Sequence, residues 1–192
     1  MASLEKVWST IDATLKKVSP RAAATFRKPA TDKGLAALEQ ALQVKLPADL
    51  RALLSLHDGQ DEKKRLPVLF AKTTWFLLPA ASIISTYESL NELEADGEFD
   101  DLEGSNQDGL VKPLWWSEAW IPFATNAAGD SLCVDAGPTK KGKVGQLLWW
   151  YHDEEFRERE AEHLAAFFSD YAKALSAGEL TVRADGGIIG GV

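Results

Sequence analysis

The order in which helical and strand patterns follow one another constrains the fold of this chain more than any other feature of its sequence. Apolar residues repeat every three or four positions in five segments, which predicts helices over 3–18, 31–42, 47–57, 80–94 and 164–175. β-Branched and aromatic runs bounded by Gly, Asn and Pro predict strands over 67–70, 74–78, 119–124, 131–135 and 145–151. This order predicts the α+β class: a central, mainly antiparallel sheet with the N-terminal helices, one mid-chain helix and the C-terminal helix packed around it.

Local signals mark the ends of the N-terminal helices. Thr31 is expected to cap the second helix, because its hydroxyl can accept a hydrogen bond from a free backbone amide. Pro47 is expected at the first position of the third helix, where its missing N–H costs nothing. Asp58 and Gly59 are expected to end that helix in a left-handed cap, so that His57 faces the negative end of the helix dipole.

The length and the cysteine content favour one ordinary domain. A chain of 192 residues can bury a core without metals or disulfides, and we expect a single domain over 1–184 followed by a flexible glycine-rich tail over 185–192. Cys133 is the single cysteine, so no intramolecular disulfide can form, and a reducing compartment is favoured.

No segment of this sequence reads as a signal that would direct the protein out of the cytoplasm. Glu5, Lys6 and Asp12 interrupt the apolar stretch that a secretory signal requires. The longest uncharged apolar stretch, 73–87, is shorter than the roughly 20 residues that a membrane-spanning helix needs. We therefore expect a cytoplasmic protein that does not bind membranes.

Charge is concentrated in one stretch, 88–110, which we call the acidic segment. The chain carries 21 basic and 29 acidic residues, and the acidic segment holds nine acidic residues and no basic one. This balance disfavours nucleic acid, whose phosphates need clustered Lys and Arg. The segment is either a solvated helix end and loop or a surface that steers and binds a basic protein partner. The candidate partner-binding residues are Glu92, Glu94, Asp96, Glu98, Asp100, Asp101, Glu103 and Asp108, with Trp115 and Trp116 just beyond them.

Residues 137–144 resemble a phosphate-binding loop without meeting its chemistry. They read GPTKKGKV and match G-x-x-x-x-G-K, but Val144 stands where a hydroxyl residue should hold magnesium. A phosphate loop also joins a strand to a helix, whereas this segment joins two expected strands. We interpret it as a basic hairpin loop and expect no nucleotide or other cofactor.

Two other groups invite a catalytic interpretation that the residues do not support. Cys133 lies inside an expected strand, where a free cysteine is usually a small buried hydrophobe. His152 precedes three carboxylates, but adjacent strand residues point to opposite faces, so the four side chains do not converge on one ion. We expect no catalytic residues, no metal site and no enzyme activity.

Seven tryptophans are many for this length. Exposed tryptophans stack on sugars or anchor protein partners. Trp149 and Trp150 face opposite sides of an expected strand, so at least one of them serves the core. For most of the set we expect core and sheet-covering roles.

Four segments together resemble the SUKH superfamily, which includes the yeast cell-wall assembly regulators. They are LQVKLPADLRALLSLHDGQ (42–60), WFLLP (75–79), WIPFATNAAGDSLCVD (120–135) and GKVGQLLWWYHD (142–153), and the resemblance spans about 31–178. The positions that match the family's motifs are Leu46, Pro47, Leu50, Leu54, Gly59, Trp120, Pro122, Gly129, Asp130, Cys133 and Asp135. Two pairs depart from the pattern: Ala127-Ala128 stand where relatives tend to have glycines, and Glu162-His163 replace a Pro-Ser cap of the final helix.

The resemblance implies a non-enzymatic α+β domain with no shared catalytic set. Bacterial members are similar to immunity proteins that neutralise toxins, often nucleases, whereas fungal members regulate glucan synthesis and cell-wall assembly. The long disordered flanks of the fungal members are missing here, which favours the bacterial interpretation.

Our leading hypothesis is an immunity protein that occludes a basic toxin domain with its acidic segment. The alternative is a regulatory scaffold in cell-wall assembly or polysaccharide synthesis, in which exposed tryptophans would matter more than carboxylates. The oligomeric state stays open.

Overall fold

The structure is a computed structural model that describes residues 3–68, 75–126 and 128–190. The helices are α1 (Leu4–Val18), α2 (Pro20–Ala23), α3 (Asp32–Leu42), α4 (Ala48–Leu56), α5 (Ala80–Ala95) and α6 (Leu164–Ala177). The strands are β1 (Trp75–Leu77), β2 (Trp120–Asn126), β3 (Ser131–Asp135), β4 (Gln146–Trp150), β5 (Arg159–Ala161), β6 (Thr181–Val182) and β7 (Ile188–Ile189). The five expected helices are present, whereas the expected strand over 67–70 lies partly outside the described residues. Within the described chain, no helix is both long enough and apolar enough to cross a membrane.

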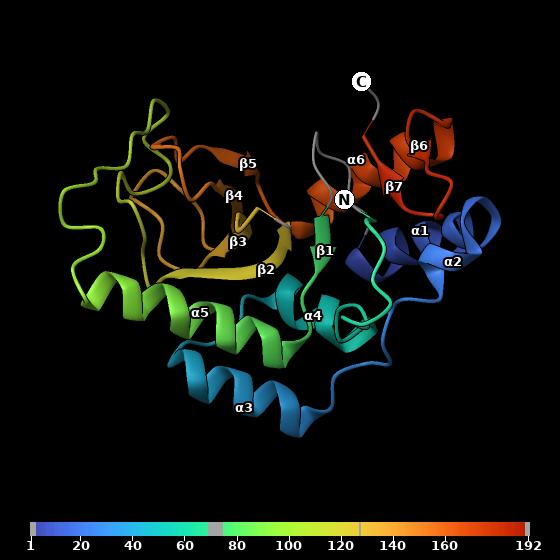
Figure 1. Cartoon of the computed structure of the whole chain (residues 1–192), viewed down its shortest axis with the longest axis horizontal. Coiled ribbons are helices and arrows are strands. Elements are labelled where there is room, and N and C mark those ends of the chain that lie inside the picture. Colours follow the sequence, from blue (N-terminus) through green and yellow to red (C-terminus); the bar gives the residue numbers. More distant parts are fainter. Residues whose placement is uncertain (1–2, 69–74, 127, 191–192) are drawn as a thin grey trace.

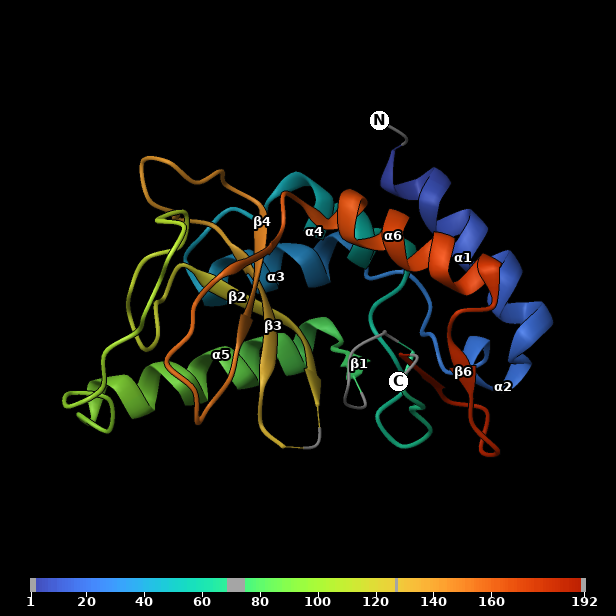
Figure 2. The same cartoon turned by 90° about the horizontal axis from the view of Figure 1, so that it is seen from above.

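One antiparallel sheet in the order β1-β2-β3-β4-β5 forms the centre of the fold (Figure 1). Every residue of β3, the middle strand of this sheet, is buried. On one side α5 packs against β2, and α3 packs against α5. At the other end of the molecule α1 and α6 lie side by side, near α2 and β6 (Figure 2). This architecture confirms the α+β class with a central antiparallel sheet.

The expected helix starts are close to the observed ones. The hydroxyl of Thr31 accepts a hydrogen bond from the backbone N–H of Gly34 at 3.1 Å, which confirms Thr31 as the cap of α3. Pro47 directly precedes α4 as its N-cap and is not its first helical residue. The fixed φ of proline therefore sets the entry to the helix from one position earlier than expected.

The expected left-handed cap at Asp58–Gly59 is wrong. The helix α4 ends at Leu56, and His57 is already extended. Gly59 does have a positive φ of 63°, but a close approach of two chain segments explains it better than a helix cap. A Cβ at Gly59 would lie 2.3 Å from the carbonyl carbon of Leu78, so only glycine fits there.

The tryptophans mainly build the core, as expected. Trp8, Trp75, Trp116, Trp120 and Trp150 are all at most 3 % exposed. The two tryptophans of β4 pack against different partners: the Trp149 ring lies 4.6 Å from that of Trp75, and the Trp150 ring lies 5.6 Å from that of Trp116. The alternation of the strand thus places one indole on each face of the sheet.

The glycine-rich tail differs from the flexible segment expected over 185–192. Over its described part it forms the second strand of a hairpin, in which β6 pairs with β7 around Gly186. Ile188 is fully buried, and its N–H donates a hydrogen bond to the carbonyl oxygen of Pro67 at 2.7 Å. An Asp-Gly pair between two short β-branched runs is a hairpin signal, and the burial of Ile188 holds the hairpin against the domain.

A buried arginine attaches the loop after α5 to the sheet. The fully buried Arg157 side chain donates hydrogen bonds to the carbonyl oxygens of Trp115 (3.1 Å), Tyr151 (3.3 Å), Glu154 (2.6 Å) and Phe156 (2.9 Å). Its guanidinium also lies 4.9 Å from the centre of the Trp115 ring. Burial lowers the pKa of Arg157 to about 10, which leaves the group charged at neutral pH. Carbonyl dipoles and an aromatic face therefore stabilise this charge.

Replacing Arg157 with Met should lower the free energy of unfolding by about 3 kcal/mol, because buried carbonyl oxygens lose their donors. Urea unfolding followed by tryptophan fluorescence measures the change. Arg183→Met is the matched control: Arg183 is exposed and its side chain pairs with Asp185 at 3.3 Å, so its loss should cost less than about 1 kcal/mol. Equal losses in the two variants would show that Arg157 does not hold the loop.

Candidate functional site

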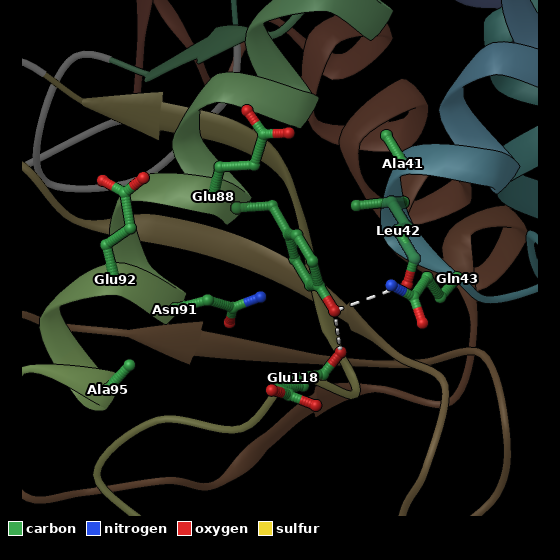
Figure 3. A pocket seen from close by; sticks show the side chains of 9 residues that line it. Ala41, Leu42, Gln43, Glu88, Asn91, Glu92, Ala95 and Glu118 are labelled. Atoms are coloured by element: carbon green, nitrogen blue, oxygen red, sulfur yellow. Dashed lines mark hydrogen bonds between the residues drawn. The ribbon is translucent and has the colours of Figure 1, made fainter.

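The acidic segment contributes to a groove of about 520 Å³ between the C-terminal end of α3 and one face of α5 (Figure 3). We call it the α3–α5 groove. Along α5 its lining residues stand three or four positions apart, so they share one face of the helix. The lining consists of Ala41, Leu42, Gln43, Tyr87, Glu88, Asn91, Glu92, Ala95 and Glu118.

Tyr87 joins the parts of the groove to one another. Its hydroxyl donates a hydrogen bond to the carbonyl oxygen of Glu118 at 2.8 Å and lies 3.5 Å from the carbonyl oxygen of Leu42, as the dashed lines in Figure 3 mark. Burial raises the pKa of Tyr87, so the hydroxyl keeps its proton. The end of α3, the face of α5 and the segment before β2 therefore meet at one hydroxyl group.

The groove is negatively charged. Glu88, Glu92 and Glu118 are exposed, and none of them forms an ion pair with a described residue. The helices α3 and α5 run in the same direction (Figure 1), and the last turn of each carries no basic side chain. The carboxylates thus add to the negative ends of two helix dipoles. A positively charged ligand is favoured in this groove.

A second hollow of about 480 Å³ continues the groove, with Asn91, Ala95 and Glu118 shared between them. It is also lined by Glu94 and by Lys112. Burial and the charge of Glu118 raise the pKa of Glu94, so these two carboxylates repel each other.

The structure places the two candidate tryptophans below the surface to different depths. Trp116 is 1 % exposed, and its indole N–H donates a hydrogen bond to Asn91 Oδ1 at 2.7 Å. It supports α5 from beneath and offers almost no surface to a partner. Trp115 is partly buried between Arg157 and Phe99, whose ring lies 6.4 Å away.

Only part of the acidic segment meets at the groove. Glu92 lines the groove and Glu94 the adjoining hollow, whereas the other six candidate carboxylates follow in the exposed stretch after α5: Asp96, Glu98, Asp100, Asp101, Glu103 and Asp108. Sequence reasoning missed Tyr87, Asn91 and Glu118. The spacing of Tyr87 and Asn91 along one helix face was readable, but Glu118 lies beyond the acidic segment and reaches the groove only through the fold.

The family-motif residues have structural roles. Burial raises the pKa of the Cys133 thiol, which is fully buried and therefore stays protonated. Asp135 is buried too and accepts hydrogen bonds from Gln146 Nε2 and from the N–H of Gly137, both at 3.0 Å. Gly129 has a positive φ of 101° in the turn between β2 and β3. The remaining buried motif positions are Leu46, Leu50, Leu54, Trp120 and Pro122.

Asp130, His152 and Asp153 lie close enough together to surround a metal ion. Both carboxylate oxygens of Asp130 are already engaged, however. Oδ1 accepts a hydrogen bond from the backbone N–H of His152 at 3.1 Å and lies 2.8 Å from its Nδ1, while Oδ2 accepts one from Asn126 at 2.7 Å. The arrangement fits an ion pair that fastens the turn after β2 to the end of β4.

Loop 137–144 joins β3 to β4, which confirms the expectation that it connects two strands and not a strand to a helix.

Glu162-His163, which departs from the family's Pro-Ser pattern, still caps α6. His163 Nδ1 accepts a hydrogen bond from the N–H of Ala166 at 3.2 Å, as a serine hydroxyl would. Of the other departing pair, Ala127 lies outside the described residues.

His57 was expected to face the negative end of its helix, but it contacts other groups. Its ring packs 5.7 Å from that of Trp8 and 5.2 Å from that of Phe26. Its Nδ1 lies 2.9 Å from the carbonyl oxygen of Arg27, so the side chain connects α4 to the segment before α3.

Replacing His152 with Ala should destabilise the protein more in mildly acidic than in alkaline solution. Asp130 raises the pKa of His152 above its ordinary 6.5. Burial of Asp130 opposes its ionisation, but hydrogen bonds from His152 and Asn126 prevail and lower its pKa below 3.8. The raised histidine pKa stabilises the fold fully below pH 6.5, and this contribution is lost as the pH rises through the raised value. The aspartate contribution is lost only as the pH falls through its lowered value.

Urea unfolding of both proteins at about pH 5.5 and about pH 9 tests this dependence, and the free-energy difference should be larger at the lower pH. Asp153→Asn is the control, because the exposed Asp153 carboxylate lies 3.9 Å from His152 Nδ1 and should contribute little. A difference that does not change with pH would contradict the ion pair.

Comparison with known proteins gives a consistent result. The model of the SMI1 / KNR4 family (SUKH-1) matches residues 29–170, more than half of the chain. The cell wall assembly regulator SMI1 of Saccharomyces cerevisiae is 23 % identical over an alignment of 202 positions, which includes 89 % of this chain and 40 % of the yeast protein. The cell wall biosynthesis/cell cycle regulator smi1 of Schizosaccharomyces pombe is 29 % identical over 160 residues, which cover 77 % of this chain and 31 % of that protein.

A third relative, the glucan synthesis regulatory protein of Neurospora crassa, is 25 % identical over an alignment of 213 positions, which includes 93 % of this chain and 39 % of that protein. The chain thus spans at most 40 % of the length of these relatives. Their names describe regulators, and none of these three names describes an enzyme. The resemblance to the SUKH superfamily is confirmed.

Proposed function

The chain belongs to the SMI1 / KNR4 family, and we propose that it is a non-enzymatic, protein-binding regulator of cell-wall assembly or glucan synthesis. The names of the three relatives support this role, whereas none of those names supports toxin neutralisation. The alternative hypothesis from the sequence therefore becomes the preferred one. We place the binding in the cytoplasm, because a chain with a single cysteine and no intramolecular disulfide fits a reducing compartment.

The observation that carries the binding role is the charge of the α3–α5 groove. Three carboxylates without a described cationic partner stand beside the carbonyl end of α3. A lysine or arginine side chain of a protein partner complements this arrangement, because it can donate to the carboxylates and to the carbonyl oxygens at the helix end. The same charges repel the phosphates of nucleic acids and of anionic membranes.

A chimera tests the role and the groove together. This chain replaces its matching part in the Saccharomyces cerevisiae relative, and the chimera is expressed in a strain that lacks that relative. We expect it to restore growth in the presence of Calcofluor white, a dye that stresses cell walls, and to restore the glucan content of the wall. The double variant Glu88→Gln, Glu92→Gln should restore neither, because the groove loses two of the three carboxylates that bind the partner.

The double variant Glu158→Gln, Glu179→Gln is the matched control, since it removes two exposed carboxylates away from the groove. It should behave like the unchanged chimera, and thermal unfolding should show both variants to be folded. A well-expressed chimera that restores nothing would contradict the cell-wall role. Equal rescue by both variants would contradict binding through the groove.

A further inference from the structure

Three large exposed apolar side chains belong to chain segments that meet at one junction of the backbone. Leu102, Leu114 and Phe156 are 41 %, 44 % and 47 % exposed. They come from parts of the chain that lie far apart in the sequence, and each lies within two residues of a backbone contact between those parts. Three of the exposed large apolar residues of the described chain thus belong to this one junction. Exposed apolar residues that are scattered singly need no explanation, whereas a group of them marks a candidate interaction site.

The backbone contacts define the junction. Ser105 pairs with Phe156 in an isolated bridge: the N–H of Ser105 donates to the carbonyl oxygen of Glu155 at 2.7 Å, and the N–H of Arg157 donates to the carbonyl oxygen of Ser105 at 2.8 Å. On the other side, a Cβ at Gly104 would lie 2.2 Å from the carbonyl oxygen of Leu114, so only glycine allows these segments to touch.

Hydrogen bonds within the unbound chain already connect the segments of the junction. The backbone N–H of the buried Arg157 donates to Ser105, and its guanidinium donates to the carbonyl oxygens of Trp115 and Phe156. A preformed surface loses little conformational entropy on binding, so its exposed apolar area contributes more of its free energy to affinity.

Carboxylates flank the apolar residues along the chain. Near Leu102 in the sequence are Glu98, Asp100, Asp101 and Glu103, and Phe156 is preceded by Glu154 and Glu155, all of them exposed. None of the six forms an ion pair with a described residue. Leu114 also lines, together with Lys112, the hollow that continues the α3–α5 groove, so this apolar residue adjoins the groove.

We propose that Leu102, Leu114 and Phe156 form a docking patch for a segment of a partner protein that carries apolar side chains flanked by lysine or arginine. The apolar side chains cover the patch, and the basic side chains meet the surrounding carboxylates and the groove. This inference rests on the proposed protein-binding function and adds the chemistry of the partner.

The charge around the patch argues against other occupants. A second copy of the chain docking patch to patch would bring six carboxylates against six others. An anionic membrane surface would be repelled by the same side chains. A basic segment of a different protein is the occupant whose charge complements the patch.

A synthetic peptide of leucine and lysine at helical spacing is the probe, and its affinity is measured by calorimetry. A second peptide has serine in place of leucine and the same charge. The whole chain should bind the leucine peptide more tightly. The double variant Leu114→Ser, Phe156→Ser should lose roughly tenfold in affinity for the leucine peptide and nothing for the serine peptide.

The double variant Val144→Ser, Val182→Ser removes two exposed apolar side chains elsewhere and should bind like the unchanged chain. The groove variant Glu88→Gln, Glu92→Gln should lose affinity for both peptides. Urea unfolding checks that the patch variant is folded, and the single variant Leu102→Ser replaces it if it is not.

Equal affinity of the unchanged chain for the two peptides would overturn the patch and leave the groove in place. A patch variant that keeps its affinity for the leucine peptide would overturn it as well. Sedimentation equilibrium adds a third outcome: a dimer of the unchanged chain that the patch variant abolishes would assign the patch to a second copy.

Discussion

The burial of one positive charge determines where the loop after α5 can go. A guanidinium away from water is stable only where dipoles or opposite charges surround it. At Arg157 carbonyl oxygens from both the loop and the β4–β5 connection supply those dipoles, together with the face of Trp115. The loop must therefore fold back against the sheet. This places Leu114 and Phe156 at the same end of the molecule as the groove.

The buried positive charge contrasts with the carboxylates of the groove, which form no ion pair with a described residue. Glu94 and Glu118 repel each other, and Glu92 stands in the last turn of α5, where the helix dipole disfavours a negative charge. Such an arrangement costs stability in the isolated protein. It is expected of a binding surface, because association with a basic partner converts the same repulsion into affinity.

The sequence predicts the local features of this fold and misses those that depend on distant residues. Periodicity found the five longest helices, and Thr31 marked the start of α3 by its own chemistry. Glu92 was predicted because a run of acidic residues can be recognised in the sequence itself. Glu118 was not, since it reaches the groove through the contact of its backbone with Tyr87. The positive φ of Gly59 was anticipated with the wrong cause, because the approach of Leu78 is invisible before folding.

The C-terminal hairpin joins the last part of the sequence to the first. The carbonyl oxygen of Gly186 accepts a hydrogen bond from Ser19, 167 positions away, and α6 packs along α1. A chain growing on the ribosome cannot make these contacts until residue 186 has been synthesised. Trp8 of α1 can meet Phe26 and His57 early, but its contact with Phe168 must wait for α6. The order of synthesis therefore leaves the side of α1 that faces α6 available to chaperones until α6 is made.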